Sequence, residues 1–262
     1  MQLIANLSML FTERPLLQRV AAAREAGFDA VEIQFPYEVS PFELRRELDD
    51  NGMPLVLINL PAGDLMSGGA GLACQPKLGR KFAEALDTAL EYAAIVKPQK
   101  VNVLAGRLLE GQDPQQVFMT LANNLYEAAR AFSRLHVQVL AEAVNPLDMP
   151  GFFLNTPQQQ LELLREIAQP NVRAQLDLYH MARQGIDPLQ AIGELGEQIG
   201  HVQFADCPGR HQPGTGSLDF MALRERLQQA GYSGGWAAEY RPLGSTIDSL
   251  DWMQDDAFAR TT

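Results

Sequence analysis

The sequence has few cysteines and histidines and no long hydrophobic run. Its two cysteines, Cys74 and Cys207, lie far apart and form no CxxC pair, which argues against a disulfide framework and a cysteine-based zinc site. The four histidines are too few for a multi-histidine zinc cluster. No apolar stretch approaches the roughly 20 residues that a membrane-spanning helix needs, so we expect no membrane association.

Basic residues are also scarce. The formal net charge is −11 and no run rich in Lys or Arg occurs, so the electrostatic footprint of a nucleic-acid-binding protein is missing. The acidic balance is typical of a surface that favours solubility. Because an acidic surface repels an anionic substrate, an acid substrate would require local Arg or His residues that reverse the field inside the pocket.

The sequence shows no targeting segment and no phosphate-binding glycine motif. Met1–Phe11 is apolar but lacks a basic start and a small-residue cleavage site, so we interpret it as a first strand and expect a cytoplasmic protein. The segment Met9–Thr12 holds no glycine, which disfavours the GxGxxG turn of a doubly wound dinucleotide-binding sheet.

Short apolar runs alternate with longer segments of helical period along the chain. The runs, each typical of a buried strand, are Leu3–Leu7, Ala30–Phe35, Leu55–Leu60, Val101–Ala105, Val137–Ala141, Ala174–Leu178, His201–Ala205 and Trp236–Tyr240. The segments typical of amphipathic helices are Pro15–Ala26, Pro41–Asn51, Leu78–Ile95, Pro114–Leu135, Pro157–Ala168, Pro188–Ile199 and Phe220–Ala230. We interpret Gly27, Gly52, Gly200 and Gly231 as helix stop signals.

This alternation predicts an α/β fold. Strands and helices that alternate with no break in composition form a parallel sheet with crossover helices, and eight strands favour closure into a (β/α)₈ TIM barrel. Such a barrel uses about 250 residues, so we expect residues 1–262 to form a single barrel domain. An open doubly wound sheet is the main alternative. Pro61–Gly71 is a Gly-rich loop long enough to cover an active site.

A polar residue stands at the end of each apolar run. In a TIM barrel the functional groups come from the C-terminal ends of the strands, so these residues are the candidates for a site. Polar groups at the rim of a packed strand are unfavourable unless they bind something. In chain order these residues are Asn6, Glu32, Asn59, Asn102, Glu142, Asp177, Gln203 and Glu239.

The last four of these residues belong to strands five to eight, which are neighbours in a barrel; they are Glu142, Asp177, Gln203 and Glu239. Two Glu, one Asp and one amide oxygen form the oxygen-rich set that Mg²⁺ or Mn²⁺ prefers, whereas zinc would recruit His or Cys. Without a cation, three packed carboxylates repel one another and raise a pKa. The sequence therefore predicts a divalent metal site formed by these four side chains.

Two glutamates in one pocket also suit acid–base catalysis. In the isomerisation of a hydroxy-carbonyl compound, a base removes a proton beside the carbonyl, and the enediolate then receives a proton on the neighbouring carbon. A divalent cation that holds both oxygens stabilises the negative charge. Glu142 and Glu239 are the natural catalytic pair, and Asp177 and Gln203 would then be mainly ligands.

Other candidates are less specific. His180 could orient a substrate oxygen or cap the exit of its strand, and Arg210 could neutralise a substrate carboxylate or remain a solvated loop residue. Asn59 is a candidate substrate-binding residue at the end of the third run. Arg241 is interpreted as a solvated residue, and Glu32 as a partner of the ligands that takes no direct part in catalysis.

The same residues lie in segments that resemble the hydroxypyruvate isomerase family, which includes 2-oxo-tetronate isomerases and belongs to the xylose-isomerase-like TIM barrels. The resemblance runs over nearly the whole chain, and its most distinctive segments are Asn6–Phe11 and Asn59–Asp64. The other similar segments are Phe35–Tyr37, Asp177–Met181, Pro213–Gly216 and Glu239–Pro242.

The resemblance implies an intramolecular oxidoreductase of the aldose–ketose type that depends on a divalent metal. It implies that hydroxypyruvate and 2-hydroxy-3-oxopropanoate, or their four-carbon analogues, are interconverted, with Glu142 and Glu239 as the proton donor and acceptor. The sequence departs from the family at Ala143-Val144, where Pro-Ile is usual, at Val103, where Cys is usual, and at Arg241, where Lys is usual. These departures leave the choice between three-carbon and four-carbon substrates open.

Three rival functions remain to be separated by experiment. A ketose 3-epimerase would use the same two glutamates on the same barrel, with a roomier pocket and usually a histidine at the position of Gln203. A DNA endonuclease on this barrel would need a zinc cluster rich in histidine, which this chain lacks. A sugar-acid binding protein would need the metal but not two proton carriers. Assembly into a homo-oligomer is left open.

Overall fold

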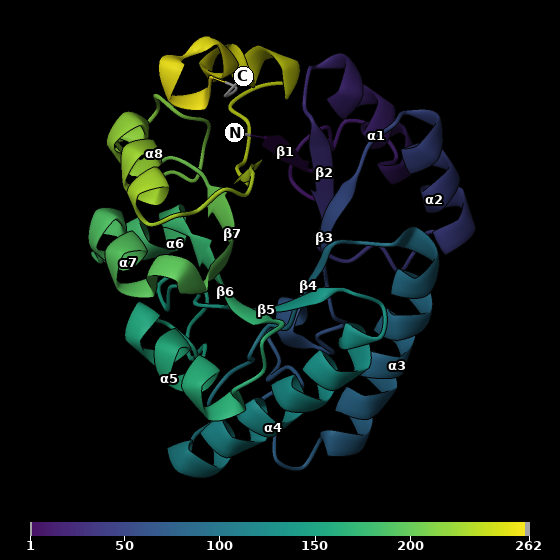
Figure 1. Cartoon of the computed structure of the whole chain (residues 1–262), viewed down its shortest axis with the longest axis vertical. Coiled ribbons are helices and arrows are strands. Elements are labelled where there is room, and N and C mark those ends of the chain that lie inside the picture. The colour runs from purple at the N-terminus through teal and green to yellow at the C-terminus, as the bar shows by residue number, and fades with distance from the viewer. Residues whose placement is uncertain (1, 260–262) are drawn as a thin grey trace.

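The computed structural model describes residues 2–259 and shows eight parallel strands closed into a barrel in chain order (Figure 1). Each strand pairs with its two neighbours, and β1 pairs with β8 to close the ring. The strands are β1 (Leu3–Asn6), β2 (Ala30–Ile33), β3 (Leu55–Asn59), β4 (Lys100–Asn102), β5 (Gln138–Glu142), β6 (Val172–Asp177), β7 (Ile199–Phe204) and β8 (Trp236–Ala238). The predicted TIM barrel is confirmed.

Eight helices surround the barrel within the described residues (Figure 1). They are α1 (Leu16–Glu25), α2 (Pro41–Asp50), α3 (Gly79–Val96), α4 (Pro114–Ser133), α5 (Pro157–Ile167), α6 (Leu178–Arg183), α7 (Pro188–Leu195) and α8 (Phe220–Gln229). Local sequence fixes several starts: proline takes the first turn of α2, α4, α5 and α7, where no backbone donor is needed. Thr156 and Gln159 form a capping box on α5, which satisfies two backbone donors.

One predicted helix end was wrong. The segment Pro188–Ile199 was expected to continue to a stop at Gly200, but α7 ends at Leu195 and Gly200 lies inside β7. The chain turns at Gly196, whose positive φ of 50° favours glycine. Glycines at three other helix ends, Gly27, Gly52 and Gly231, do have the positive φ that a stop requires.

Besides the short 3₁₀ helix η1 (Leu65–Ser67) in the loop after β3, two parts of the described chain hold helices that the periodicity did not indicate. α6 has six residues, too few to display a helical period, and it begins directly after Asp177, whose side chain accepts from two backbone N–H groups of its first turn. After β8, three short 3₁₀ helices, η3 (Ile247–Ser249), η4 (Asp251–Gln254) and η5 (Asp256–Phe258), take the place of a longer helix. Trp252 and Phe258 pack there, with ring centroids 4.6 Å apart.

The strands are buried because helices cover their outer faces and side chains fill the interior. Alternation along a strand directs residues two positions apart to the same face, so the residues two positions before the rim also point inward. Five of these, with Val56, form a separate apolar cluster below the rim: Ile4, Ala30, Leu57, Leu140 and Ala237. Among residues 2–259, none of the helices combines the length and apolar character needed to span a bilayer.

Candidate active site

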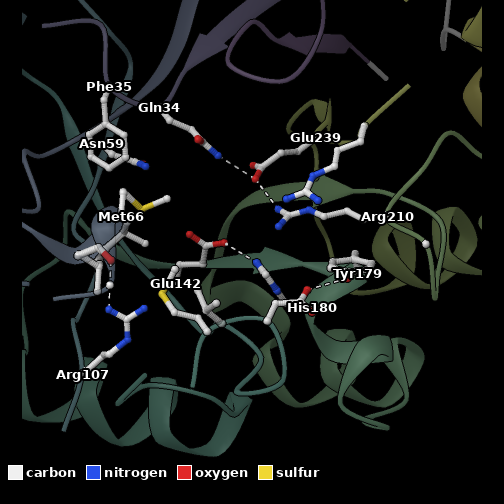
Figure 2. A pocket seen from close by; sticks show the side chains of 18 residues that line it. Gln34, Phe35, Asn59, Met66, Arg107, Glu142, Tyr179, His180, Arg210 and Glu239 are labelled. Carbon is white, nitrogen blue, oxygen red and sulfur yellow. Dashed lines mark hydrogen bonds and ion pairs between the residues drawn. The ribbon is translucent and has the colours of Figure 1, made fainter. Parts of the chain in front are cut away.

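A cavity of about 550 Å³ opens at the C-terminal ends of the strands, where a TIM barrel carries its functional groups. Asn59, Met66 and Arg107 line one side of it, and Tyr179 and Arg210 line the other (Figure 2). The loop Pro61–Gly71, predicted to cover an active site, contributes Leu65, Met66 and Gly68 to the wall.

The four predicted metal ligands lie on adjacent strands, as the barrel order requires. Glu142 and Asp177 are the last residues of β5 and β6, Gln203 is the penultimate residue of β7, and Glu239 directly follows β8. Asp177 and Gln203 are register partners across the β6–β7 pair. All four are buried, with relative exposures of 5% for Glu142, 1% for Asp177 and Gln203, and 4% for Glu239.

Glu142 lies in an environment that favours its neutral form. Its Oε2 accepts a hydrogen bond of 2.8 Å from Asn102 Nδ2, which is its one hydrogen bond within the described chain. Burial, followed by repulsion from the charge of Asp177, raises the pKa of Glu142 to about 8. A carboxyl group with such a pKa can hold or release a proton near neutral pH.

Asp177 and Glu239 share a guanidinium. Arg210 Nη2 lies 2.6 Å from Glu239 Oε1 and 3.4 Å from Asp177 Oδ2. Gln34 Nε2 and Asn6 Nδ2 also donate to Glu239, at 3.0 and 3.2 Å. Burial nevertheless raises the pKa of Glu239 well above its usual value, and Arg210 offsets this only in part. Both glutamates therefore share the property expected of proton carriers.

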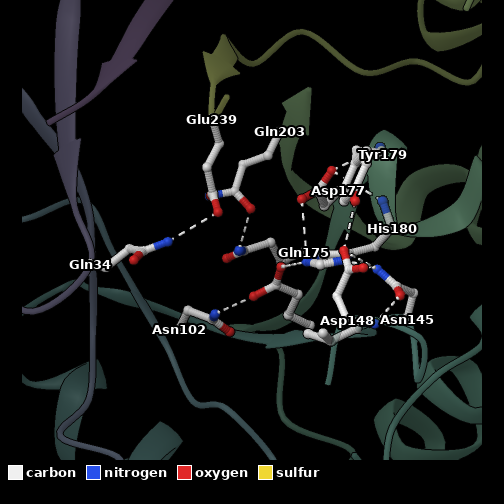
Figure 3. Close-up of polar contacts among 12 residues, drawn as sticks. Gln34, Asn102, Asn145, Asp148, Gln175, Asp177, Tyr179, His180, Gln203 and Glu239 are labelled. Atoms are coloured by element: carbon white, nitrogen blue, oxygen red, sulfur yellow. Dashed lines mark hydrogen bonds and ion pairs between the residues drawn. The ribbon is translucent and has the colours of Figure 1, made fainter. Parts of the chain in front are cut away.

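Gln203 turns its two amide ends to different partners. Its Nε2 donates to Glu32 Oε1 at 2.8 Å. Its Oε1 accepts from Gln175 Nε2 at 2.6 Å, a contact drawn in Figure 3. An amide oxygen has two lone pairs, so one remains for a further partner. The role of Gln203 as an oxygen ligand stays a prediction from the sequence.

His180 joins Glu142 and Asp177 in a buried group whose potential ligand atoms all lie within 4.8 Å of one another. Its Nδ1 faces Asn145 Nδ2 at 2.6 Å. Asn145 Oδ1 accepts from the backbone N–H groups of residues 147 and 148, so the amide nitrogen is the atom turned toward the ring. Nδ1 is therefore an acceptor, and Nε2 carries the hydrogen. Burial lowers the pKa of His180 to about 4, so the ring is neutral.

Of the four predicted ligands, Glu142 and Glu239 line the cavity, whereas Asp177 and Gln203 do not. The predicted substrate-binding residues Asn59, His180 and Arg210 all line it. Asn59 ends β3 and lines the cavity, and its buried Oδ1 has no hydrogen-bond partner in residues 2–259. Arg210 is part of the site, since it contacts two carboxylates and stacks on Tyr179 at 5.0 Å from the ring centre. Arg241 is exposed, as the sequence interpretation expected, and it also lines the cavity. Glu32 does not line it.

Several cavity residues were missed because they lie in loops beyond the strand ends. Asp148 accepts from Tyr179 Oη at 2.6 Å and from Asn145 Nδ2 at 3.2 Å. Arg107 lines the opposite side, where its guanidinium donates to backbone carbonyls of Leu65, Gly69 and Pro150. The presence of polar residues in these loops was the available signal, but spacing alone does not show which of them turn inward.

Known proteins share this fold and much of this sequence. The family model described as Xylose isomerase-like TIM barrel matches residues 20–256. Hydroxypyruvate isomerase from Escherichia coli (strain K12) is 36% identical over 249 residues, which cover 95% of this chain and 96% of that protein. A 2-oxo-tetronate isomerase from Cupriavidus necator is 38% identical over 250 residues, which cover 95% of this chain and 96% of that protein.

Solved structures give the same result. A protein named AP endonuclease, family 2, from Brucella melitensis has a TM-score of 0.92 at 34% identity, covering 96% of this chain and 97% of that one. D-psicose 3-epimerase with D-tagatose from Clostridium cellulolyticum H10 has a TM-score of 0.78 at 19% identity, over 98% and 91% of the two chains, which shows a shared fold alone. The chain belongs to the xylose isomerase-like TIM-barrel family, within the group that contains hydroxypyruvate isomerase and 2-oxo-tetronate isomerase.

Proposed function

We propose that this protein is an isomerase of small hydroxy-oxo acids. One of Glu142 and Glu239 removes a proton from the substrate and the other delivers one to it, beside a divalent cation. The observation that carries the proposal is that both glutamates are buried in one cavity and both have a raised pKa, in a chain 36–38% identical to two isomerases of this kind. The substrates are hydroxypyruvate, giving 2-hydroxy-3-oxopropanoate, or the corresponding 2-oxo-tetronate.

The donor set fits a hard divalent ion. Glu142, Asp177 and Glu239 supply three carboxylates, and Gln203 supplies an amide oxygen with a free lone pair. Arg210 is the one cation that contacts these carboxylates within residues 2–259, which leaves the group with excess negative charge. Mg²⁺ or Mn²⁺ would be held by these four residues and would stabilise the negative charge that develops on the substrate oxygens.

The reaction then needs one proton to leave one carbon and another to arrive at its neighbour. One glutamate takes a proton from the hydroxyl-bearing carbon, a double bond forms between the two carbons, and the carbonyl oxygen gains the electron pair. The second glutamate gives a proton to the former carbonyl carbon, and the new carbonyl forms at its neighbour as the hydroxyl hydrogen moves between the oxygens. Two carboxyl groups that line one cavity suit this exchange of roles.

His180 and Asn59 would orient the substrate. Because His180 Nε2 carries the hydrogen, it is a donor aimed at the carboxylates, and this favours a substrate oxygen as its partner over a place among the metal ligands. Asn59 Oδ1, buried and without a partner in the described chain, would accept from a substrate hydroxyl. A neutral histidine keeps this donor throughout the neutral pH range.

Two further arginines favour an acid over a neutral sugar. Arg107 and Arg241 line the cavity, and neither forms an ion pair in the part of the chain that is described. Arg210, by contrast, is held by Asp177 and Glu239. In a protein with a net charge of −11, unpaired guanidinium groups in the cavity supply the local positive field that an anionic substrate requires.

These features also bear on the rival functions. Among the described residues, His180 is the one histidine that lines the cavity, so no histidine-rich zinc cluster for DNA cleavage is supported, despite the name of the Brucella protein. A ketose 3-epimerase would have no use for the unpaired Arg107, and a binding protein would have none for two proton carriers. The cytoplasmic location, the single-domain organisation and the oligomeric state stay predictions from the sequence.

The test is a comparison of substrates by NMR in the presence of Mg²⁺ or Mn²⁺. We expect interconversion of hydroxypyruvate or 2-oxo-tetronate at a rate that far exceeds any epimerisation of a ketohexose. Treatment with EDTA should remove the activity, and either ion should restore it. Faster turnover of a ketohexose, or full activity in the chelator, would overturn the proposal.

A further inference from the structure

A third glutamate, Glu32 of β2, is fully buried below the rim and outside the cavity. Its Oε1 accepts hydrogen bonds of 2.8 Å from both Asn6 Nδ2 and Gln203 Nε2. Its Oε2 lies 2.6 Å from His201 Nε2. The carboxylate thus contacts one proposed metal ligand directly and, through Asn6, a second, because Asn6 Nδ2 also lies 3.2 Å from Glu239 Oε2.

These contacts determine which way the Gln203 amide points. The two ends of an amide have nearly the same shape, but a carboxylate can only accept, so it selects the nitrogen end. Gln203 therefore presents Nε2 to Glu32, and its Oε1 accepts instead from Gln175 Nε2, the contact that Figure 3 shows. Asn6 is fixed in the same way, because its Oδ1 accepts from the backbone N–H of Ser8.

Glu32 lies at the end of a chain of polar contacts that runs from Lys100 through His201. Three side chains, His201, Asn6 and Gln203, direct nitrogen atoms at the Glu32 carboxylate. Lys100 Nζ lies 3.4 Å from His201 Nδ1 and donates to the Gly200 carbonyl at 2.8 Å. With an ammonium beside Nδ1, His201 accepts there and presents an N–H to Glu32.

We propose that Glu32 is a positioning residue of the active site: it holds Gln203 with its oxygen available to the divalent cation and keeps Asn6 on Glu239. This inference rests on the proposed function, because it requires Gln203 to be a ligand. Groups that orient a metal ligand from behind typically change metal affinity about 10- to 100-fold when they are replaced. The role is therefore measurable without any assay of turnover.

The substitution Glu32→Gln makes a sharp prediction because it keeps the shape and removes the charge. Lys100 holds His201 as a donor, so the new amide must turn its oxygen to His201 and its nitrogen to Asn6 and Gln203. Gln203 must then turn its Oε1 toward the new amide at position 32 and away from the cation. We expect the affinity for Mn²⁺, measured by titration calorimetry or electron paramagnetic resonance, to fall about 10- to 100-fold.

A second variant separates positioning from a merely structural role. In Glu32→Gln/Gln203→Glu, the carboxylate at 203 accepts from the amide at 32 and has no nitrogen end to present to the cation. We expect Mn²⁺ affinity to return at least to the wild-type value. Gln203→Glu alone places two carboxylates where the wild type has a 2.8 Å hydrogen bond, so it should weaken folding. If Glu32 only supported the fold, the losses of Mn²⁺ affinity in the two single variants should add up in the double variant. Glu225→Gln on the exposed face of α8 controls for the change in net charge.

The outcomes test the role of Glu32 and the proposed metal site separately. Wild-type Mn²⁺ affinity in Glu32→Gln, or no recovery in the double variant, overturns the role of Glu32 while the metal site stands. If the single variant does not fold, recovery in the double variant still supports the role and its absence still overturns it. A wild-type protein that binds no Mn²⁺, or binds it unchanged after Asp177→Asn, overturns the proposed metal site itself.

Discussion

The rim of the barrel and the layer just beneath it hold the same residue type in opposite states. At the rim, burial and nearby carboxylates raise the pKa of Glu142 and Glu239. Beneath it, Glu32 is more deeply buried, yet its donors and His201 lower its pKa. The number of hydrogen bonds separates Glu142, with one, from Glu32, with three, within the described residues. Glu239 also accepts three, and the nearby charges of Asp177 and Glu142 help to keep its pKa raised.

The same contrast separates the arginines. Arg210 is matched by two carboxylates, whereas Arg107 is held by backbone carbonyls and has no ion-pair partner in residues 2–259. A charge whose partners lie inside the protein fixes the position of its neighbours. A charge without such partners is available to a ligand or a proton. Each of the following predictions tests one side of this distinction.

The largest effect is expected at the rim. We predict that Glu142→Gln and Glu239→Gln each lower kcat on the order of 10²- to 10⁴-fold, because each removes one proton carrier while it keeps the shape of the side chain. The measurement is steady-state turnover of hydroxypyruvate, with substrate binding followed by calorimetry. Binding should largely survive, and Glu225→Gln should behave as wild type. A near wild-type rate in Glu142→Gln or Glu239→Gln would contradict the role of that glutamate as a proton carrier.

An intermediate effect is expected at the unpaired guanidinium. Arg107→Met should raise KM for an acid substrate roughly 10- to 100-fold, since a hydrogen bond to a charged group contributes about 1.5–3 kcal/mol. Arg107→Lys keeps the charge and should lose less. Steady-state kinetics of both variants at low and high salt check this. An unchanged KM for the acid in Arg107→Met would show that Arg107 only fastens the loop around Leu65 and Gly69.

The last effect concerns stability without metal. The pKa of Glu142 is raised to about 8 in the folded protein and is near 4.3 in an unfolded chain, so unfolding favours ionisation of this group between these values. The free energy of unfolding in EDTA should therefore fall with rising pH across this window, by up to about 1.4 kcal/mol per pH unit from this group. Glu142→Gln should flatten the dependence in urea titrations at pH 5, 6.5 and 8. Parallel curves for both proteins would contradict the raised pKa.

Much of the fold could be predicted because the barrel repeats a simple pattern. The apolar runs place all eight strands, and polar residues such as Glu142 and Asp177 mark their ends because the rim of a barrel is where they can be used. α6 could not be predicted, because its six residues show no period and its start depends on the Asp177 side chain. The stop at Gly200 was wrong because a glycine inside a strand and one after a helix look alike in sequence.

The candidate site could be predicted only as far as strand ends determine it. The sequence indicates Gln203 as a ligand, but its amide orientation depends on Glu32, which is 171 residues away in the chain. Arg107 and Asp148 enter the cavity from loops whose course no local pattern fixes. The neutral state of His180 depends on its burial and the position of its hydrogen depends on Asn145, and only the folded chain provides both.

The origin of the proton on the product tests the exchange between Glu142 and Glu239 most directly. When hydroxypyruvate is isomerised in D₂O with Mg²⁺ and followed by NMR, a second carboxyl group must deliver the new proton, so the former carbonyl carbon should carry deuterium from solvent. Wild type should incorporate deuterium, and Glu142→Gln and Glu239→Gln should not. Product formed without deuterium, or deuterium incorporated at the wild-type rate by either variant, would contradict a mechanism in which one glutamate removes a proton and the other delivers a new one.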